Sequence, residues 1–290
     1  MTMPSTLPSP LSLDFIDAQI KDLSAAPQIL PKLQALIRDC NTNPDDIFTL
    51  IKLDQTLTTR VIKTSNSAFF APKSRIDNIE DAVTYLGYDE VFRVITLVAF
   101  AKLMSGPLVC YGLSAGELWE KSIATAVTLE VLSQTHNSAT NTGYTIGLLH
   151  SIGMIFVDKH LLAMRSNKRF NLDAEPETLE ADETTTLGLS HADVGAHVLN
   201  RWKFPENICE PVHFQLRPLE CQTYGKSACL LNLAKDIGSK FISSGCQKFN
   251  APEPDPLILS LIGGSTEDYE KTMDKVGTKL AMIDVLLQEL

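Results

Sequence analysis

The segment of residues 145–156, TIGLLHSIGMIF, places a histidine inside a strongly apolar stretch. A histidine followed by an aspartate on a buried helix would suit metal-dependent hydrolysis of phosphoesters, because imidazole and carboxylate groups are common ligands of hydrolytic metal ions. In this sequence Ser151 follows His150. Two interpretations are open: a hydrolase with a changed ligand, or a protein that kept a scaffold and lost the chemistry.

His150 could act as a catalytic acid or base, or it could be a buried histidine whose ring nitrogens satisfy neighbouring polar groups. We favour the second interpretation, because buried histidines serve structural roles more often than catalytic ones. Ser151 is a poor candidate for a nucleophile activated by His150, because adjacent residues on a helix point about 100° apart. The sequence contains no G-x-S-x-G elbow, phosphate-binding loop or dinucleotide fingerprint.

A second pair with possible chemistry is Asp193 and His197, which lie four residues apart. On one helix they would share a face and could bind a metal ion. A surface ion pair, or Asp193 as the acid of a helix capping box, is the interpretation we favour. The six cysteines form no C-x-x-C pair, so we expect reduced thiols and assign no function to them.

Composition excludes some classes of function. The formal charge is −10, and no cluster of four or more Lys or Arg occurs, so we expect no nucleic-acid partner. The apolar run of residues 94–101 is too short to cross a bilayer, and the N-terminus lacks a signal-peptide pattern. The sequence therefore predicts a soluble cytoplasmic protein without a membrane partner.

Helix signals recur along the chain. Asn43, Asp54 and Asn78 are typical N-cap residues before apolar stripes at helical spacing, and Gly87 is a typical helix end. Residues 114–117 (SAGE) and 190–193 (SHAD) have the pattern of capping boxes, and each is expected to open a helix. Residues 145–156 are apolar on most faces, which predicts a central helix.

These signals predict an all-α fold, because no strand-like alternation persists and no internal repeat occurs. We expect a disordered N-terminus at residues 1–11, an N-terminal helical lobe at 12–110, and a helical core with the C-terminal helices at 111–290. The lobe and the core are expected to form one continuous unit.

Several motifs together resemble those of HDOD domains. They are ILPKL, LDQTLTTRVIKTSNSAFF, IEDAVTYLG, LWEKS, GLLHSIGM and SHADVGAHVLNRWKFPENI, in the family's order between about residues 30 and 241. The resemblance implies an HD-domain-like helical bundle with an additional N-terminal lobe, related to the HD phosphohydrolases. It also implies a regulatory module of bacterial signalling, because most HDOD domains are regarded as such and not as hydrolases.

Carried over residue by residue, the resemblance implies a degenerate metal site. Lys121 stands where HD hydrolases have a metal-binding histidine, and His150 with Ser151 stands where they have the His–Asp pair. A further histidine pair falls on Gln215 and Leu216, two residues after His213. The final aspartate falls on Lys235, with Asp236 adjacent.

Such a set of residues is unsuited to a divalent cation. Serine is a weak neutral ligand, and an ammonium group at a ligand position repels the metal. At an effective dielectric constant of ~20, two unit charges ~4 Å apart interact by about 4 kcal/mol, and the metal carries two charges. We therefore expect no metal, no cofactor and no catalytic residue.

A possible ligand or partner surface is predicted around Asn66, with Arg60 and Arg93 nearby. Asn66 could anchor a turn that shapes such a surface. Alternatively, it only ends its helix, because asparagine tolerates left-handed backbone angles, and we favour this alternative.

Two functions follow. The first is a non-catalytic signalling module that acts through protein–protein contacts with unidentified signalling proteins, and that could bind a small anion at Lys121. The second is an unconventional phosphohydrolase or phosphodiesterase for nucleotides or cyclic dinucleotides, with a metal site rebuilt from His150, His191, His213 or nearby acids. No receiver or cyclic-dinucleotide domain accompanies these motifs, so we expect the partner to be a separate chain.

Overall fold

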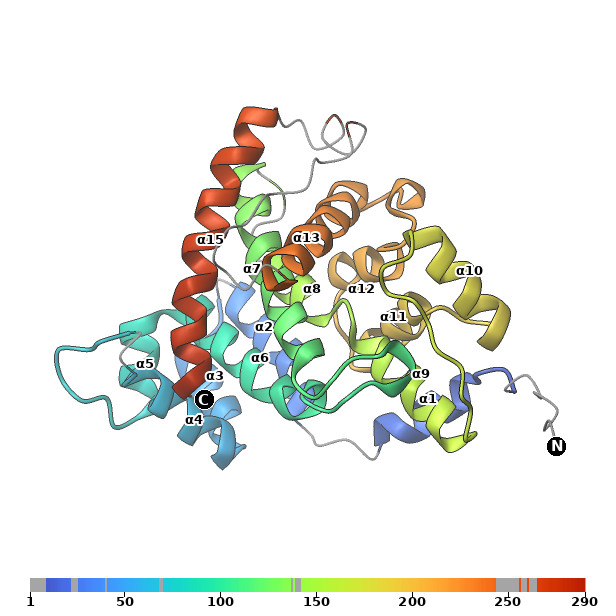
Figure 1. Cartoon of the computed structure of the whole chain (residues 1–290). Helices are drawn as coiled ribbons and strands as arrows, with labels where there is room; N and C mark the ends of the chain where they lie inside the picture. Colours follow the sequence, from blue (N-terminus) through green and yellow to red (C-terminus); the bar gives the residue numbers. More distant parts are fainter. Residues whose placement is uncertain are drawn as a thin grey trace.

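The structure of the protein is a computed structural model that describes residues 9–21, 26–39, 41–67, 70–136, 138, 142–243, 256, 260 and 265–289. All regular elements in these ranges are helices, and the only extended pairing there is an isolated bridge between Leu108 and Leu113. The predicted all-α fold is confirmed (Figure 1).

The first part of the chain forms helices that gather around α6. Their bounds are α1 Leu13–Lys21, α2 Ala26–Arg38, α3 Pro44–Lys52, α4 Gln55–Ser65, α5 Ile79–Leu86 and α6 Tyr88–Met104. The α6 helix packs against α2, α4 and α5, and it also reaches α7 and α8 of the second part. One helix departs from this arrangement: α1, which we predicted as part of the N-terminal lobe, packs against α9 and α11.

The second part is a bundle around α7 and α8. Its helices are η1 Val109–Tyr111, α7 Glu117–Thr135, α8 Gly143–Leu149, α9 Ile152–Ala163, α10 Pro176–Leu187, α11 His191–Arg201, α12 Glu206–His213, η2 Pro218–Glu220, α13 Gly225–Ser243 and α15 Thr266–Glu289. The α7 helix contacts α8, α13 and α15, and the long α15 runs beside it (Figure 1). A single hydrophobic core extends through both parts.

The predicted helix ends are largely as expected. Asn43, Asp54 and Asn78 each accept a backbone N–H at the start of their helices, and Gly87 ends α5 with φ +81°. Ser190 and Asp193 form the predicted capping box. The capping box predicted at residues 114–117 is wrong, because Ser114 is not the N-cap of α7. Ser114 donates to the Glu117 carboxylate, but α7 begins at Glu117 itself.

The reason lies at Gly116, which stands before α7 with φ +88° and makes no side-chain cap. This left-handed residue turns the chain immediately before the helix, so Ser114 lies outside the N-cap position. The predicted central helix also differs from the structure, because His150 and Ser151 separate α8 from α9.

The ordered part of the chain includes residues 9–11, which we predicted to be disordered. Leu11 is buried, and its N–H donates to the Leu187 carbonyl oxygen over 2.8 Å. The Ser9 carbonyl accepts from His160 Nε2 over 2.9 Å. These contacts attach residues 9–11 to α9 and α10, contrary to the predicted disorder. Residues 1–8 lie outside the described part.

Two glycines allow helices to touch backbone to backbone around His150. A Cβ atom on Gly147 would lie 2.6 Å from Ala126 Cα, so α8 packs directly on α7. A Cβ atom on Gly153 would lie 2.0 Å from the His191 carbonyl oxygen, so α9 packs directly on α11. Any side chain would separate these helices, and the close packing therefore fixes the position of the α8–α9 junction.

The stretch Gly143–Ala163, 21 residues, has the length and composition of a membrane span, but 83% of its most apolar window is buried inside the protein. Burial by protein on all sides is what the central helices of a helical bundle require. We therefore interpret α8 and α9 as core helices.

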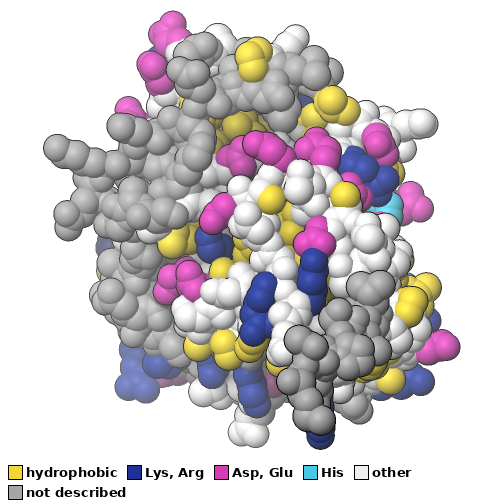
Figure 2. Space-filling model, turned by 45° about the vertical axis from the view of Figure 1, so that its right-hand side comes forward, with side chains coloured by type: hydrophobic (Ala, Val, Ile, Leu, Met, Phe, Trp, Pro, Cys, Tyr) yellow, Lys and Arg dark blue, Asp and Glu magenta, His cyan; other side chains and the backbone are white. Residues whose placement is uncertain are grey.

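Figure 2 shows that Lys and Arg side chains are spread in small groups over one face, with acidic side chains among them.

Candidate functional site

His150 lies at the junction of α8 and α9 and is 7% exposed. Its Nδ1 faces the Gly147 carbonyl oxygen at 2.7 Å, which assigns the ring proton to Nδ1. The His150 carbonyl in turn accepts from Gln215 Nε2 over 2.7 Å. His150 is thus a buried histidine satisfied at Nδ1, and its Nε2 carries the lone pair.

Ser151 is buried beside α7. Its hydroxyl lies 2.7 Å from the hydroxyl of Ser122, and both side chains are almost inaccessible to solvent. The hydroxyl that replaces the expected carboxylate is therefore engaged by a second serine. This pair offers neutral oxygen atoms, which bind a divalent cation weakly.

The positive charge at the site comes from Lys235 on α13. Burial, together with the charges of Lys235 and His191, lowers the pKa of His150 to about 3, although the Gly147 hydrogen bond opposes this shift. Burial also lowers the pKa of Lys235 to about 8, while Asp236 and Glu183 oppose this effect. At neutral pH a neutral imidazole therefore lies within the electrostatic influence of an ammonium group, which is the reverse of a metal site.

Lys121 occupies a different place from Lys235. Its carbonyl accepts from Thr125 Oγ1 over 2.9 Å. The pKa of Glu117 is lowered mainly by the hydrogen bonds from Ser114 to its carboxylate, and the Lys121 ammonium group makes a smaller contribution in the same direction. Its described interactions lie within and just before α7. Ser122, one position later, is the α7 residue that contacts Ser151.

Gln215 is fully buried directly after α12, where the resemblance implies a histidine. Besides His150, its Nε2 donates to the Val212 carbonyl over 3.1 Å, and its Oε1 has no described hydrogen-bond partner. His213 is more exposed, and its Nδ1 lies 3.6 Å from Asp193 Oδ1. Gln215 therefore points into the site and His213 does not contact it.

A buried acid–base network adjoins the His150 junction. Glu183 on α10 is 0% exposed and accepts from the Tyr111 hydroxyl over 2.5 Å. The same carboxylate accepts from the His191 backbone N–H over 2.8 Å and faces His191 Nδ1 at 2.8 Å. Three elements, η1, α10 and the start of α11, are joined at one carboxylate.

The charge of this network follows from its contacts. Burial alone would raise the pKa of Glu183, but the His191 charge and the hydrogen bonds from His191 and Tyr111 outweigh burial, so the pKa is lowered. Burial and the Glu183 charge raise the pKa of Tyr111 well above its ordinary value. Glu183 is therefore an ionised acceptor with every described donor already in place.

Asp158 on α9 positions η1, and with it Tyr111. Its Oδ1 accepts from the Cys110 backbone N–H over 2.7 Å. Burial and Asp158 together raise the pKa of the Cys110 thiol, so this cysteine is a poor nucleophile. Sequence reasoning missed the Asp158 contact, because it joins residues 48 positions apart.

The family's metal ion can be tested against these donors. His150 Nε2 is an available ligand, but Ser151 is bound to Ser122, Gln215 presents its amide nitrogen to the backbone, and Lys235 is positive. Within the described ranges, no group of three or more His, Cys, Asp and Glu side chains could hold a metal ion. These residues do not fit a hydrolytic metal.

The other candidate pair, Asp193 and His197, does not form a common site. Asp193 accepts from the Ser190 hydroxyl and backbone in the capping box, while His197 Nε2 lies 2.9 Å from Asp17 Oδ1 on α1. Arg201 also contacts Asp17, over 3.1 Å. His197 therefore helps to attach α1 to α11 and shares no ligand with Asp193.

The residues predicted to form a surface around Asn66 also have unrelated roles. Asn66 ends α4 with φ −92°, so a left-handed angle is not the reason for asparagine here. Its side chain instead bridges to the Ile76 peptide, accepting from N–H over 2.8 Å and donating to the carbonyl over 2.7 Å. Asn66 therefore anchors a turn. Arg60 is partly exposed and has no described ion-pair partner.

Arg93 is engaged inside the protein. It pairs with Glu130 of α7 and lies 3.6 Å from Glu90, with its guanidinium 4.8 Å from the centre of the Tyr144 ring. Glu130 also accepts from Lys279 of α15 over 3.0 Å. Arg93 thus holds α6, α7 and α15 together, and little of it is available to a partner.

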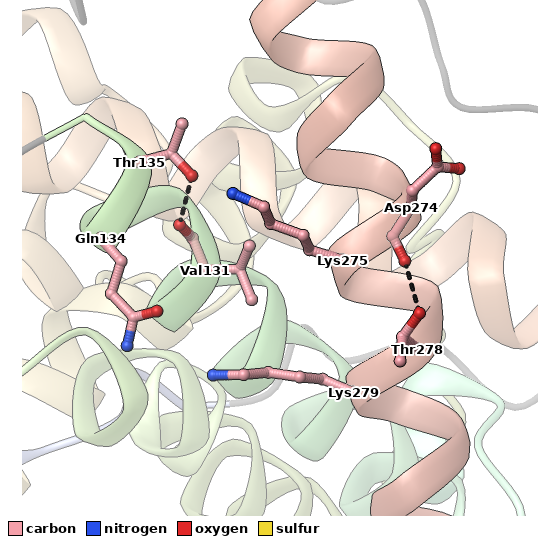
Figure 3. A pocket seen from close by; sticks show the side chains of 7 residues that line it. All are labelled: Val131, Gln134, Thr135, Asp274, Lys275, Thr278 and Lys279. Atoms are coloured by element: carbon pink, nitrogen blue, oxygen red, sulfur yellow. Dashed lines mark hydrogen bonds between the residues drawn. The ribbon is translucent and has the colours of Figure 1, made fainter.

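A surface pocket of about 460 Å³ lies between α7 and α15 (Figure 3). Lys275 and Lys279 extend from α15 toward α7 across it. Its lining residues are Val131, Gln134, Thr135, Asp274, Lys275, Thr278 and Lys279. Its ionisable lining residues are Asp274, Lys275 and Lys279, and no histidine or cysteine lines it.

A family model described as the HDOD domain matches residues 23–218. The chain belongs to the HDOD domain family. This match includes His150, Ser151 and Gln215, and it ends before Lys235.

Several known proteins are similar to this chain. A protein of Treponema pallidum (strain Nichols), named "Uncharacterized protein", is 25% identical over 201 residues, which cover 68% of this chain and 38% of that protein's length. A crystal structure from Shewanella amazonensis SB2B, named "Putative phosphohydrolase", has a TM-score of 0.64 and 20% identity, covering 95% and 96% of the two chains.

A second crystal structure, from Marinobacter aquaeolei VT8 and named "Putative signal transduction protein", has a TM-score of 0.70 and 19% identity. The alignment covers 95% of this HDOD protein and 65% of that chain. At these identities the similarity shows the fold alone.

Proposed function

We propose that this HDOD protein is a non-catalytic regulatory module of bacterial signal transduction that acts through protein–protein contacts. The observation that carries the proposal is that the Lys235 ammonium group acts on a neutral His150 at the place where the resemblance implies a metal ion. The Ser151 hydroxyl lies within hydrogen-bond distance of the Ser122 hydroxyl, and the Gln215 amide nitrogen donates to the His150 carbonyl, so both side chains are held by internal hydrogen bonds.

One observation favours the alternative, a metal-dependent phosphohydrolase or phosphodiesterase. His191 lies close enough for its charge to influence His150, and a carboxylate, Glu183, is in contact with His191. A metal bound by these three would have to displace the Tyr111 hydroxyl and the His191 backbone N–H from Glu183. Each of these is a hydrogen bond to a charged, buried group, worth about 1.5–3 kcal/mol.

The proposal includes the setting of the module. We propose a cytoplasmic location and separate signalling proteins as partners, without nucleic acid or membrane. The negative net charge of the chain supports the exclusion of nucleic acid. A small anion, if it binds at the degenerate site, would pair with Lys235 and not with Lys121, because the Lys235 charge is the one that acts on His150.

An activity screen tests the proposal. The full chain is incubated with Mn²⁺ and with linear and cyclic dinucleotides, mononucleotides and an aryl phosphodiester, beside a His150→Ala variant. We expect no hydrolysis above the buffer rate by either protein. Hydrolysis by the wild type that His150→Ala abolishes would overturn the proposal and establish the alternative.

A further inference from the structure

A further pocket lies between α2 and α6, on the side of the N-terminal helices. Its volume is about 420 Å³, within the range of small-molecule sites. It is lined by Gln34, Ile37, Arg38, Tyr88, Asp89 and Phe92. None of these residues belongs to the His150 site, so the inference is independent of the proposed function.

Gln34 is the unusual residue of this pocket. Gln34 is 5% exposed, yet among the residues that the structure describes neither its Nε2 nor its Oε1 has a hydrogen-bond partner. A buried amide without partners destabilises the protein, because it has lost water at both ends and gained nothing in return. A leucine would pack at this position without that cost, so the amide points to a ligand with one donor and one acceptor.

The walls indicate the shape of that ligand. Tyr88 and Phe92 are four residues apart in the first two turns of α6, so they lie on one face of the helix, and both are half-buried. Aromatic side chains of this kind stack on planar heterocycles. Arg38 and Asp89 are exposed at the pocket and carry opposite charges, which favours a ligand without net charge.

We propose that this pocket binds a neutral adenine-class purine, whose amino group and adjacent ring nitrogen pair with the Gln34 amide while its ring packs on Tyr88 and Phe92. Glutamine forms the same bidentate pair with adenine in protein–DNA complexes. Both amide ends are closed to water in this structure, so binding includes a rotation of the Gln34 side chain toward the pocket.

Calorimetric titration of the full chain tests the proposal, with adenosine and with purine riboside, which lacks the 6-amino group. We expect adenosine to bind at least about tenfold more tightly than purine riboside, as expected for a bidentate base contact. Gln34→Leu is expected to remove this preference and to weaken adenosine binding by a similar factor. Gln134→Leu, the same change at an exposed glutamine on α7, is expected to have no effect.

Thermal unfolding shows whether Gln34→Leu is folded, and we expect an unfolding temperature at or above that of the wild type, because the change removes unpaired polar atoms. Phe92→Leu is a second test that leaves Gln34 in place, and it is expected to weaken both ligands. Absence of adenosine binding by the wild type, equal affinity for the two nucleosides, or undiminished adenosine binding by Gln34→Leu would each overturn the proposal.

Discussion

Replacing Lys235 with methionine removes the positive charge from the degenerate site and keeps a flexible side chain that can fill the same space. Burial lowers the pKa of Lys235 from 10.5 to about 8, in spite of Asp236 and Glu183. The folded protein therefore holds this ammonium group at a cost when the solution is neutral. We predict that Lys235→Met is more stable than the wild type at pH 7.

The magnitude follows from the lowered pKa. A difference of about 2.5 pH units, at about 1.4 kcal/mol per unit, corresponds to about 3.5 kcal/mol. The Lys235 side chain is partly exposed, so solvent screening reduces this value, and we expect a gain of about 1–2 kcal/mol in the free energy of unfolding. Replacing a buried charge with an apolar side chain of similar size has gains of this order in other proteins.

Urea unfolding at several pH values is the assay. Between pH 8 and 10.5 the unfolded chain binds more protons at this lysine than the folded chain, so the wild-type stability gains from rising pH in that window. Lys235→Met lacks this gain. Its advantage at pH 7 should therefore shrink toward zero near pH 10.5, where the lysine is neutral in the folded chain and half neutral in the unfolded chain.

Lys121→Met is the matched control, because sequence comparison alone indicates Lys121 as the cation of the site. We expect it to change stability by no more than about 0.5 kcal/mol, as is usual at surface positions. A Lys235→Met variant that is no more stable at pH 7, or an advantage that stays constant to pH 10.5, would refute the reasoning. A pH-dependent gain in Lys121→Met would show that the wrong lysine has been assigned.

Three further predictions concern the surroundings of the site. Glu183→Gln should lower the free energy of unfolding, measured in urea, by about 2–4 kcal/mol, because the amide cannot accept from every donor of the buried carboxylate. The control is Asp182→Asn, which breaks a more exposed ion pair with Lys168 and should lower the same free energy by less than about 1 kcal/mol. The depressed pKa of His150, about 3, should make the wild-type stability fall below pH 6.5 by up to about 1.4 kcal/mol per pH unit, and His150→Leu should remove that slope between pH 5 and 6.5. Gly153→Ala should destabilise the protein by about 1–3 kcal/mol or more, measured as a lower urea midpoint, because its Cβ would overlap the His191 carbonyl.

Each of these three has an outcome that contradicts it. Equal losses in Glu183→Gln and Asp182→Asn would mean that the buried carboxylate contributes no more than a surface one. A wild-type slope that persists in His150→Leu would assign the titration to another group. An unchanged midpoint for Gly153→Ala would show that α9 and α11 can separate at no cost.

Local chemistry made much of the fold predictable. The N-caps at Asn43, Asp54 and Asn78 are decided by residues a few positions away, and each was correctly predicted. The box at residues 114–117 was wrong because the pattern does not include the backbone angle of Gly116. The place of α1 depends on the distant contact between Asp17 and His197, which no local pattern contains.

The site was predicted in part, for a similar reason. The burial of His150 and Ser151 follows from the apolar residues around them, whereas the choice between Lys121 and Lys235 depends on the packing of α7 and α13 at the α8–α9 junction. Neighbouring positions on α7 point about 100° apart, so a shift of one residue brings Ser122 to Ser151 in place of Lys121.

The Glu183 network was missed because it joins elements far apart in sequence. A signal was nevertheless present: Leu179, Glu183, Thr186 and Leu187 follow helical spacing, and all four are buried. An acid in the apolar stripe of a helix requires a buried partner. The partner is His191, eight residues later, together with Tyr111.

The metal content of the purified full-length chain tests the central claim most directly. After exchange into metal-free buffer with added Mn²⁺, Fe²⁺ or Zn²⁺ and removal of excess ions, elemental analysis gives the number of ions per chain. The degenerate site predicts far less than one ion per chain, the same in the wild type and in His150→Ala. About one ion per chain in the wild type, lost in His150→Ala, would contradict the account.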